Sequence, residues 1–419
     1  MTSWLVALAC VSSALTLNAW FPQKRRRETI LFSFLAGWLT TELAWHHLVL
    51  QLTLALVTIH YGALDLLAGK LAWGALLVSW AGLLACAASS RRTSRCMDAA
   101  LDEGLAGQPP APPTAAILER LQAPIGTARL LWPFHFSHPD VEHIADLPYA
   151  NVAGSRNHLD VYRPRKPLAR APVVLQIHGG GWVVGHKRQQ ALPLLVDLAA
   201  RGCVCVSANY RLSPRATFPD QLIDVKRALI WIRQHITEYG GDPSCVIVTG
   251  GSAGGHLAAL LALTPNDARY QVGFESVDTR VQACIAFYGI YDLAALSEAP
   301  PPPGLIGLWQ RYIIKKSYRD HRDAFVDASP LHHVRRDAPP FLIVHGTHDS
   351  MAPTDAARSF ARALRETSAA PVVYAELPGA QHSFDIFHSV RTHHMIRGVH
   401  RFLAYVLQRE DCDAMRSVA

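Results

Sequence analysis

The sequence predicts an α/β domain, in which a mostly parallel sheet carries helices on both faces, preceded by transmembrane helices. Three observations support this prediction. Residues 1–90 carry few charges, short apolar strands alternate with helical patterns from residue 172 onward, and a glycine-flanked serine directly follows one of those strands. The chain has 419 residues, of which 50% are hydrophobic and 17% charged. This composition excludes a disordered chain and allows a large core.

The first 90 residues are predicted to form about three transmembrane helices. Residues 3–21 hold no charged side chain, and a membrane-spanning helix needs about 20 such residues. A secretory signal peptide would carry its basic residues before the apolar run, whereas here Lys24–Arg27 follow it. From Thr29 to Ala88 the chain is apolar again, and this length accommodates two further helices.

Two basic clusters predict how these helices are oriented. Lys24–Arg27 and the group Arg91, Arg92 and Arg95 both flank apolar segments, and basic residues beside membrane helices are typically cytoplasmic. With two helices between the clusters, we expect the N-terminus outside the cell membrane and the following domain in the cytoplasm. The formal net charge of +7 is therefore explained by membrane topology. We expect no nucleic-acid partner, because nucleic-acid binding requires a basic stripe along one folded face.

A few ionisable residues interrupt the apolar segments: Glu42, His46, His47 and Asp65. Such residues are costly in lipid. They could mark a pathway or a site for a lipid headgroup. Alternatively, they lie near helix ends or pair between helices, and we favour this second interpretation.

Residues 91–131 are predicted to be a linker and residues 132–410 a single α/β domain. The linker is rich in arginine, alanine, proline and glycine, including Gln108–Pro113, and holds one candidate helix over Thr114–Gln122. In the domain, strands are predicted over residues 172–178, 203–209, 245–249, 281–287, 340–345 and 372–376. Helices are predicted over residues 190–200, 218–239, 253–263, 354–367 and 387–408.

Ser252 is the candidate nucleophile. It occupies the centre of a Gly-x-Ser-x-Gly pattern from Gly250 to Gly254, directly after one predicted strand and before a helical run. That context places a serine on a sharp strand-to-helix turn, where its hydroxyl is exposed at the end of the sheet. A glycine-rich turn with a capping serine is the alternative interpretation.

The segment His178–Trp182, with the sequence HGGGW, follows another predicted strand. A loop of successive glycines can direct several backbone N–H groups at one point, which is what an enzyme of acyl transfer needs to stabilise an oxyanion. An HGGG loop of this kind accompanies the nucleophilic serine in lipases and esterases. The spacing of a phosphate-binding loop is not present.

Asp349 and His382 are the candidate acid and base. Each follows a predicted strand, and they come after Ser252 in the order Ser, Asp, His that this arrangement requires. The nearby alternatives are Asp385 for the acid and three histidines for the base: His345, His348 and His388. We expect no cofactor and no metal, since the adjacent histidines at 332–333 and 393–394 lack the spacing of a ligand set.

The chain from about residue 170 to 390 resembles the hormone-sensitive-lipase-like branch of the α/β-hydrolases, a family of serine carboxylesterases and lipases. The matching segments are HGGGW at 178–182, NYRLSP at 209–214, FPDQLIDVKRALIWI at 218–232, GGDPSCVIVTGGSAGGHLAA at 240–259, HGTHD at 345–349 and QHSFD at 381–385. The resemblance implies that Gly180, Gly181 and Ala253 supply the N–H groups of the oxyanion hole. Around Asp349 the sequence GTHDSMAP departs from the DPLRD-like string of that branch. The arrangement with a membrane anchor further resembles actinobacterial membrane esterases.

The resemblance implies a membrane-anchored carboxylesterase or lipase that hydrolyses small apolar esters through Ser252, Asp349 and His382. One alternative is a methylesterase of prenylated cysteine, which also acts at a membrane. The other is a ligand sensor of the same fold, in which the catalytic histidine is lost, whereas His382 is present here.

A cap over the acyl pocket is expected near residues 291–334, with residues 132–150 as its second piece. The stretch 307–318 alternates the apolar Trp309, Ile313 and Ile314 with basic residues. It could be a lid that contacts the membrane, or an ordinary cap helix, which we favour.

Overall fold

The computed structural model describes residues 1–24, 27–105, 116–123, 125–166, 168, 170–296, 304–352 and 354–416. Three features of the sequence lie outside these ranges: Arg25 and Arg26 of the first basic cluster, the proline-rich stretch 108–113 of the predicted linker, and the prolines 300–303 of the predicted cap.

The described residues form one eight-stranded sheet in the order β1-β2-β4-β3-β5-β6-β7-β8. All neighbours from β4 to β8 run parallel, whereas β2 is antiparallel to both β1 and β4. The strands are β1 (Val141–Pro148), β2 (His158–Pro164), β3 (Ala171–Ile177), β4 (Val204–Ala208), β5 (Gly241–Gly251), β6 (Ala283–Phe287), β7 (Phe341–Gly346) and β8 (Val372–Leu377). The central strands are buried along their whole length, as expected for a sheet covered on both faces.

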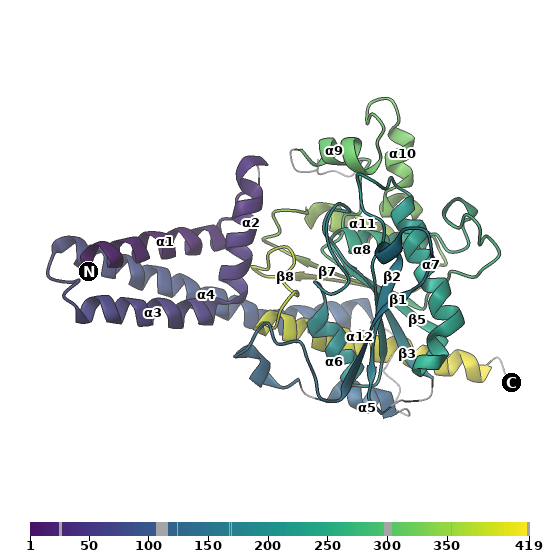
Figure 1. Cartoon of the computed structure of the whole chain (residues 1–419), viewed down its shortest axis with the longest axis horizontal. Helices are drawn as coiled ribbons and strands as arrows, with labels where there is room; N and C mark the ends of the chain where they lie inside the picture. The colour runs from purple at the N-terminus through teal and green to yellow at the C-terminus, as the bar shows by residue number, and fades with distance from the viewer. Residues whose placement is uncertain are drawn as a thin grey trace.

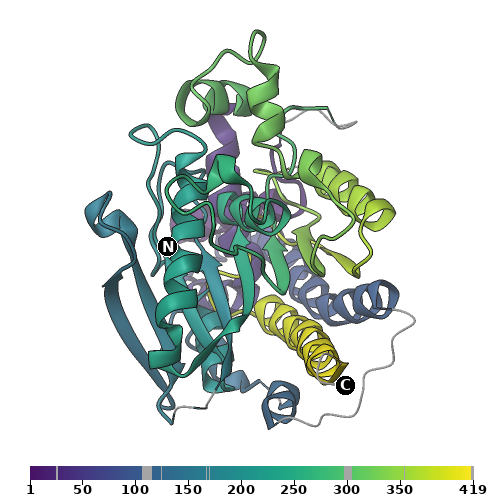
Figure 2. The same cartoon turned by 90° about the vertical axis from the view of Figure 1, so that its right-hand side faces the viewer.

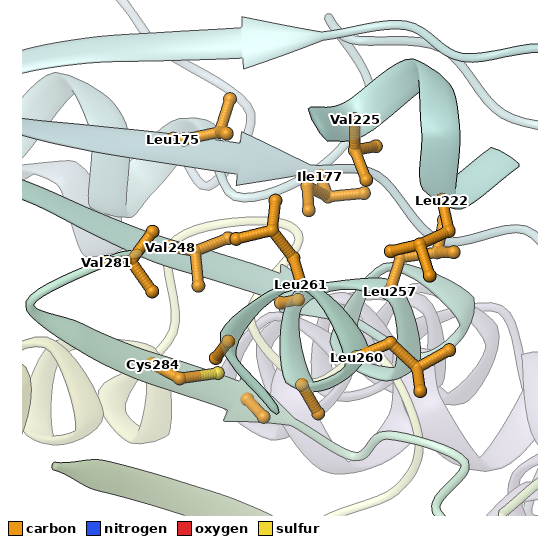
Figure 3. Close-up of a cluster of buried hydrophobic side chains, with 14 of the residues drawn as sticks. Leu175, Ile177, Leu222, Val225, Val248, Leu257, Leu260, Leu261, Val281 and Cys284 are labelled. Carbon is orange, nitrogen blue, oxygen red and sulfur yellow. The ribbon is translucent and has the colours of Figure 1, made fainter. Parts of the chain in front are cut away.

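Helices cover both faces of this sheet (Figure 2). One face packs against α7 (Asp220–His235), α8 (Ala253–Leu263) and α11 (Thr354–Thr367), and Figure 3 shows leucines of α8 packed on Val248 of β5. The other face packs against α6 (Leu192–Ala200) and α12 (Val390–Arg416). This arrangement, a mostly parallel sheet with helices on both faces, confirms the predicted α/β fold class.

The N-terminal region forms four helices among the described residues: α1 (Thr2–Trp20), α2 (Arg27–Glu42), α3 (Ala44–His60) and α4 (Leu67–Gly104). Helices α1 and α4 are each long and apolar enough to cross a membrane, and α2 with α3 would make a third span if the pair counts as one. That pair, however, is bent by 87°. Residues 29–88 therefore hold parts of three helices where the sequence predicted two.

Figure 1 shows how these helices are arranged. Helices α1, α3 and α4 run side by side away from the α/β domain, whereas α2 crosses their ends next to that domain. The bend falls at Leu43, between α2 and α3.

Helix α4 does not end near Ala88, and the first part of the predicted linker is helical. It continues to Gly104, because Met97, Ala100 and Leu101 are buried against the domain. Close packing continues at the helix end, where a Cβ on Gly104 would lie 2.8 Å from the carbonyl oxygen of Val372 in β8. Arg91, Arg92 and Arg95 lie on its exposed side. The helix predicted over 114–122 is observed as α5 (Ala116–Gln122).

The predicted cap is observed only in part. Residues 132–150 are not a second cap piece, since they include β1, the edge strand that pairs with β2. Residues 304–334 hold α9 (Leu305–Leu308) and α10 (Arg322–Asp327), which lie above the sheet in Figure 1. Trp309, Ile313 and Ile314 are buried within the protein, so the apolar side of this stretch is not available to a membrane.

Short helical turns complete the chain: η1 (Thr127–Leu130), η2 (Gly154–Asn157), η3 (Ile236–Tyr239), η4 (Ala268–Tyr270), η5 (Trp309–Ile313) and η6 (Pro330–His333).

Candidate active site

Ser252 lies on the sharp turn between β5 and α8. Its backbone has φ 57° and ψ −123°, a conformation that costs free energy for a residue with a side chain and is usually kept for function. Only glycine fits on either side of the turn. A Cβ on Gly250 would lie 2.4 Å from the carbonyl oxygen of Gly254, and a Cβ on Gly254 would lie 2.0 Å from that of Ile177. The two glycines therefore allow β5, the turn and α8 to pack closely.

The structure brings the three predicted side chains together. His382 Nε2 lies 2.8 Å from Ser252 Oγ, and its Nδ1 lies 2.7 Å from Asp349 Oδ2. Asp349 follows β7, and His382 follows β8. The three residues therefore meet at the carboxyl ends of parallel strands, where sites of open α/β sheets gather.

Asp349 is held in its ionised form. Burial alone disfavours the charge, but the electrostatic attraction to the His382 imidazole and hydrogen bonds from His345 and His382 outweigh burial and hold the pKa of this carboxyl well below its ordinary value. Its other oxygen, Oδ1, accepts hydrogen bonds from the backbone N–H groups of Met351 (2.8 Å) and Ala352 (2.7 Å). Asp349 is thus an acceptor fixed in place for the imidazole N–H of His382.

Gln381 joins the two loops that carry the acid and the base. Its Oε1 accepts hydrogen bonds from the backbone N–H groups of Ser350 (2.8 Å) and His382 (2.9 Å). Sequence reasoning did not single out Gln381. Its position directly before His382 suggested a role near the base, but the sequence does not show that its side chain bonds a loop 31 residues away.

The competing residues have other partners. Asp385 accepts a hydrogen bond from the hydroxyl of Tyr288, and burial raises the pKa of its carboxyl to about 6. His348 Nδ1 lies 3.1 Å from the carbonyl oxygen of Ala19, and His388 Nδ1 lies 3.2 Å from His393 Nε2. His345 Nε2 lies 3.3 Å from Asp349 Oδ2 and therefore supports the acid.

The HGGGW loop passes directly over the nucleophile. A Cβ on Gly179 would lie 3.1 Å from the Cβ of Ser252. The N–H of Gly179 donates to Gln190 Oε1 (2.6 Å) and is therefore occupied. Gly180 and Gly181, both at positive φ, are partly exposed beside Ser252. The family resemblance implies that their N–H groups receive the oxyanion.

The two other side chains of the HGGGW segment shape the loop. The His178 ring stacks on Tyr210 with ring centroids 4.3 Å apart, and the Tyr210 hydroxyl donates to the carbonyl of His178 (2.9 Å). Trp182 Nε1 donates to His256 Nδ1 (3.2 Å). His178 and Trp182 thus hold the loop in place through these contacts.

The N-terminal helices contact both catalytic loops. Lys24 Nζ donates to the carbonyl of Thr347 (3.1 Å) beside the acid, and the Phe34 ring of α2 stands edge-to-face against His382, with centroids 5.9 Å apart. Ser89 of α4 donates to the carbonyl of Pro378 (3.0 Å) before the base. The N-terminal region is therefore part of the surroundings of the site, which sequence reasoning did not foresee.

Glu42, at the end of α2, pairs with Arg391 of α12. Its Oε1 lies 2.7 Å from Arg391 Nε, and both side chains are fully buried. Glu42 Oε2 also accepts a hydrogen bond from Ser389 (2.8 Å). This agrees with the favoured interpretation, that the residue lies near a helix end and is paired, although its partner belongs to the α/β domain.

Among the described residues, no group of three or more histidine, cysteine, aspartate or glutamate side chains could hold a metal ion. The site consists of a hydroxyl, an imidazole, a carboxylate and backbone N–H groups.

A serine on such a turn, followed along the chain by an aspartate and a histidine bonded in this order, is typical of serine hydrolases with the α/β-hydrolase fold. Comparisons with known proteins agree. A family model described as BD-FAE matches residues 159–364. The chain is 43% identical over 412 residues to the probable carboxylic ester hydrolase LipM of Mycobacterium tuberculosis, covering 96% of this chain and 93% of that protein. The chain therefore belongs to this family of carboxylic ester hydrolases, and it is an enzyme of that class.

Other relatives match over a smaller part of this chain. Esterase LipQ of Mycobacterium tuberculosis is 44% identical over 268 residues, 63% of each chain. A probable isoprenylcysteine α-carbonyl methylesterase of Arabidopsis thaliana is 32% identical over 220 residues, 51% of this chain and 46% of that protein. Among solved structures, esterase Est2 of Thermogutta terrifontis has a TM-score of 0.53 at 28% identity, covering 64% of this chain and 95% of that one.

Proposed function

We propose that this carboxylic ester hydrolase is a membrane-anchored serine esterase, which cleaves apolar esters through Ser252, His382 and Asp349. The observation that carries the proposal is the continuous chain of contacts from Ser252 Oγ through the imidazole to the Asp349 carboxylate, 2.8 Å and 2.7 Å long. These distances are within the reach of proton transfer.

The geometry supports a two-step mechanism. His382 Nε2 takes the proton of Ser252 as Oγ attacks the ester carbonyl, and Asp349 holds the imidazole in the correct tautomer and balances the imidazolium charge. The carbonyl oxygen becomes an oxyanion that the N–H groups of Gly180, Gly181 and Ala253 receive, each lowering the barrier by about 3 kcal/mol. When the tetrahedral intermediate collapses, the C–O bond of the ester breaks and the alcohol leaves with the proton from His382.

The second step returns the enzyme to its starting state. His382 removes a proton from water, which attacks the acyl group on Ser252 Oγ. The bond to Oγ then breaks, Oγ regains a proton from His382, and the carboxylic acid leaves.

The test is covalent labelling together with turnover of p-nitrophenyl esters. Ser252→Ala should lose both labelling by an organophosphonate and ester hydrolysis while the protein stays folded. Ser244→Ala, at an exposed serine of β5, is the control and should keep both. Labelling of the Ser252→Ala protein at another serine would refute the assignment.

The second part of the proposal is the placement in the cell membrane. Three spans, formed by α1, α3 and α4, would put the N-terminus on the side opposite to the hydrolytic domain. Because Lys24 and the arginines of α4 lie at the domain end of these helices, the domain is proposed to be cytoplasmic. A reporter fused after Ala419 should behave as intracellular, and one fused before Met1 as external.

Demethylation of a prenylated cysteine is a narrower candidate, favoured by the plant relative named above. A panel of p-nitrophenyl esters of increasing chain length, run beside a farnesylcysteine methyl ester, separates the two. Preference for the methyl ester by more than tenfold in kcat/KM would favour the narrower function.

A further inference from the structure

Helix α2 has two different faces. The inner face contacts the protein: Ser33 bonds Asn18 of α1 (2.6 Å), Phe34 stands against His382, and Trp38 packs on Phe387 with centroids 5.1 Å apart. The outer face is exposed and consists of large apolar side chains: Leu31, Phe32, Leu35 and Leu39. Phe32 is the most exposed of the four, at 76%. A helix next to an active site therefore presents a row of apolar side chains that no described residue covers.

The orientation of α2 relates this row to the membrane. The axis of α2 is bent by 87° from that of α3, and α3 runs alongside α1 and α4 (Figure 1). If those three helices cross a bilayer, α2 lies along its surface, at the level where the bundle meets the hydrolytic domain. A helix that lies in this plane buries its apolar face into the boundary between headgroups and acyl chains.

A second apolar element lies beside α2. Leu131 is 74% and Trp132 73% exposed, and Phe134 is exposed as well. This segment is joined to the same place, because Phe134 packs on Phe387 with centroids 5.1 Å apart and the carbonyl of Pro133 accepts a hydrogen bond from the N–H of His388 (2.9 Å). Trp38 of α2 thus meets Phe134 at Phe387, five positions after the catalytic base.

From these contacts we propose that the outer face of α2 and the segment 131–134 together rest in one leaflet of the bilayer, and that substrate enters the site from the lipid along α2. Phe34 then forms a wall of the entrance, between the lipid and His382. The substrate class is an ester whose hydrocarbon chain resides in the membrane. This inference rests on the proposed function, since it uses Ser252 and His382 as the reacting groups.

A bilayer fits this surface better than a protein partner. The apolar row leads along the chain directly into the apolar helix α3, and the second element contains the exposed Trp132, a residue type that favours the boundary between water and lipid. Lys24, exposed just before α2, adds a positive charge where lipid headgroups would lie.

The position of α2 can be measured without activity. An environment-sensitive fluorescent amino acid at position 32 of the full-length protein, reconstituted into phosphatidylcholine vesicles, should be quenched by brominated acyl chains. The same label at position 272 is the control. Val272 is 57% exposed and lies near Phe274, which contacts Arg227 of α7, and α7 lies across the domain from α2 (Figure 1). Equal quenching at the two positions, or none at position 32, would overturn the proposal.

Kinetics test the route of the substrate. Phe32→Ser combined with Leu31→Ser should lower turnover of a long-chain ester held in the vesicles by tenfold or more. Turnover of water-soluble p-nitrophenyl acetate should stay within twofold, because neither side chain touches the catalytic residues. Val272→Ser is the matched control and should change neither rate. Equal loss toward both esters would mean that α2 only supports the fold, and no loss toward the vesicle ester would mean that substrate does not pass it.

The outcomes separate this inference from the proposed function. A wild-type protein that hydrolyses p-nitrophenyl acetate but no vesicle-borne ester would keep the serine esterase and refute the lipid route. A wild-type protein that is neither labelled at Ser252 nor active on any ester would refute the proposed function. In that case the quenching experiment still decides where α2 lies.

Discussion

Asp385 provides a pH-dependent test of how the site is built. This carboxyl is fully buried next to His382, and its pKa is raised from 3.8 to about 6 by burial, against the hydrogen bond from Tyr288. Below about pH 3, Asp385 is protonated in both the folded and the unfolded chain, so its burial does not change stability with pH. Between about pH 4 and pH 6 the carboxyl is ionised in the unfolded chain but protonated in the folded one, so folding must take up a proton, and above about pH 6 it must bury a charge.

The magnitude follows from the shift. About 2 pKa units correspond to about 3 kcal/mol, at 1.36 kcal/mol per unit. An asparagine in this place keeps an acceptor for Tyr288 and does not titrate. The free energy of unfolding of Asp385→Asn, minus that of the wild type, should therefore rise by about 2 to 3 kcal/mol between pH 4 and pH 7.

Denaturant unfolding of the detergent-solubilised protein, repeated at intervals between pH 4 and pH 8, measures this difference. Comparing the two proteins at each pH removes any constant effect of the amide, as well as the contributions of Asp349 and the other groups that both share. If the free energies of unfolding of wild type and variant change in parallel across this range, the pKa of Asp385 is not raised and the reasoning is refuted. A difference that falls with pH would reverse the sign of the argument.

Three more substitutions test the site and its supports. Asp349→Asn should lower kcat by roughly 10⁴, as in the best-studied triads, while Asp385→Asn should lower it by less than tenfold in the same p-nitrophenyl ester assay; the reverse result would make Asp385 the acid. Glu42→Gln should reduce the free energy of unfolding by about 3–5 kcal/mol, because it leaves the buried guanidinium of Arg391 without its counter-charge. The double variant Glu42→Gln, Arg391→Met should unfold at a higher temperature than Glu42→Gln alone, because it removes the unpaired charge as well. Gly180→Ala should abolish turnover, since its Cβ would lie 2.1 Å from the carbonyl oxygen of Val184; an active variant would show that the loop can move aside.

Much of the site could be predicted because its parts are local. A buried strand, a glycine-flanked serine and a helix fix the turn at Ser252 from contiguous residues, and the HGGGW loop follows its strand in the same way. The order of strands along the chain placed Asp349 and His382 after β7 and β8, and parallel strands bring their carboxyl ends to one edge.

The parts that sequence reasoning missed depend on contacts between distant residues. The predicted end of α4 near Ala88 was wrong. The helix continues because Met97 and Leu101 are buried against residues of the α/β domain that lie far along the chain. Residues 141–148 were expected in a cap, yet they pair with β2 as an edge strand. Neither outcome is encoded in a local pattern, since amphipathic stretches and short strands take their partners from the fold.

The sequence by itself determined the class of fold, the candidate nucleophile and the order of the candidate catalytic groups, because these follow from the pattern of strands, glycines and polar residues along the chain. Only the tertiary structure decided that α2 turns across the bundle and stands against His382 through Phe34. It also paired Glu42 with Arg391, 349 positions away. The physical reason is that both results depend on which buried surfaces and charges meet when the chain folds, and a sequence lists the groups without stating their distances.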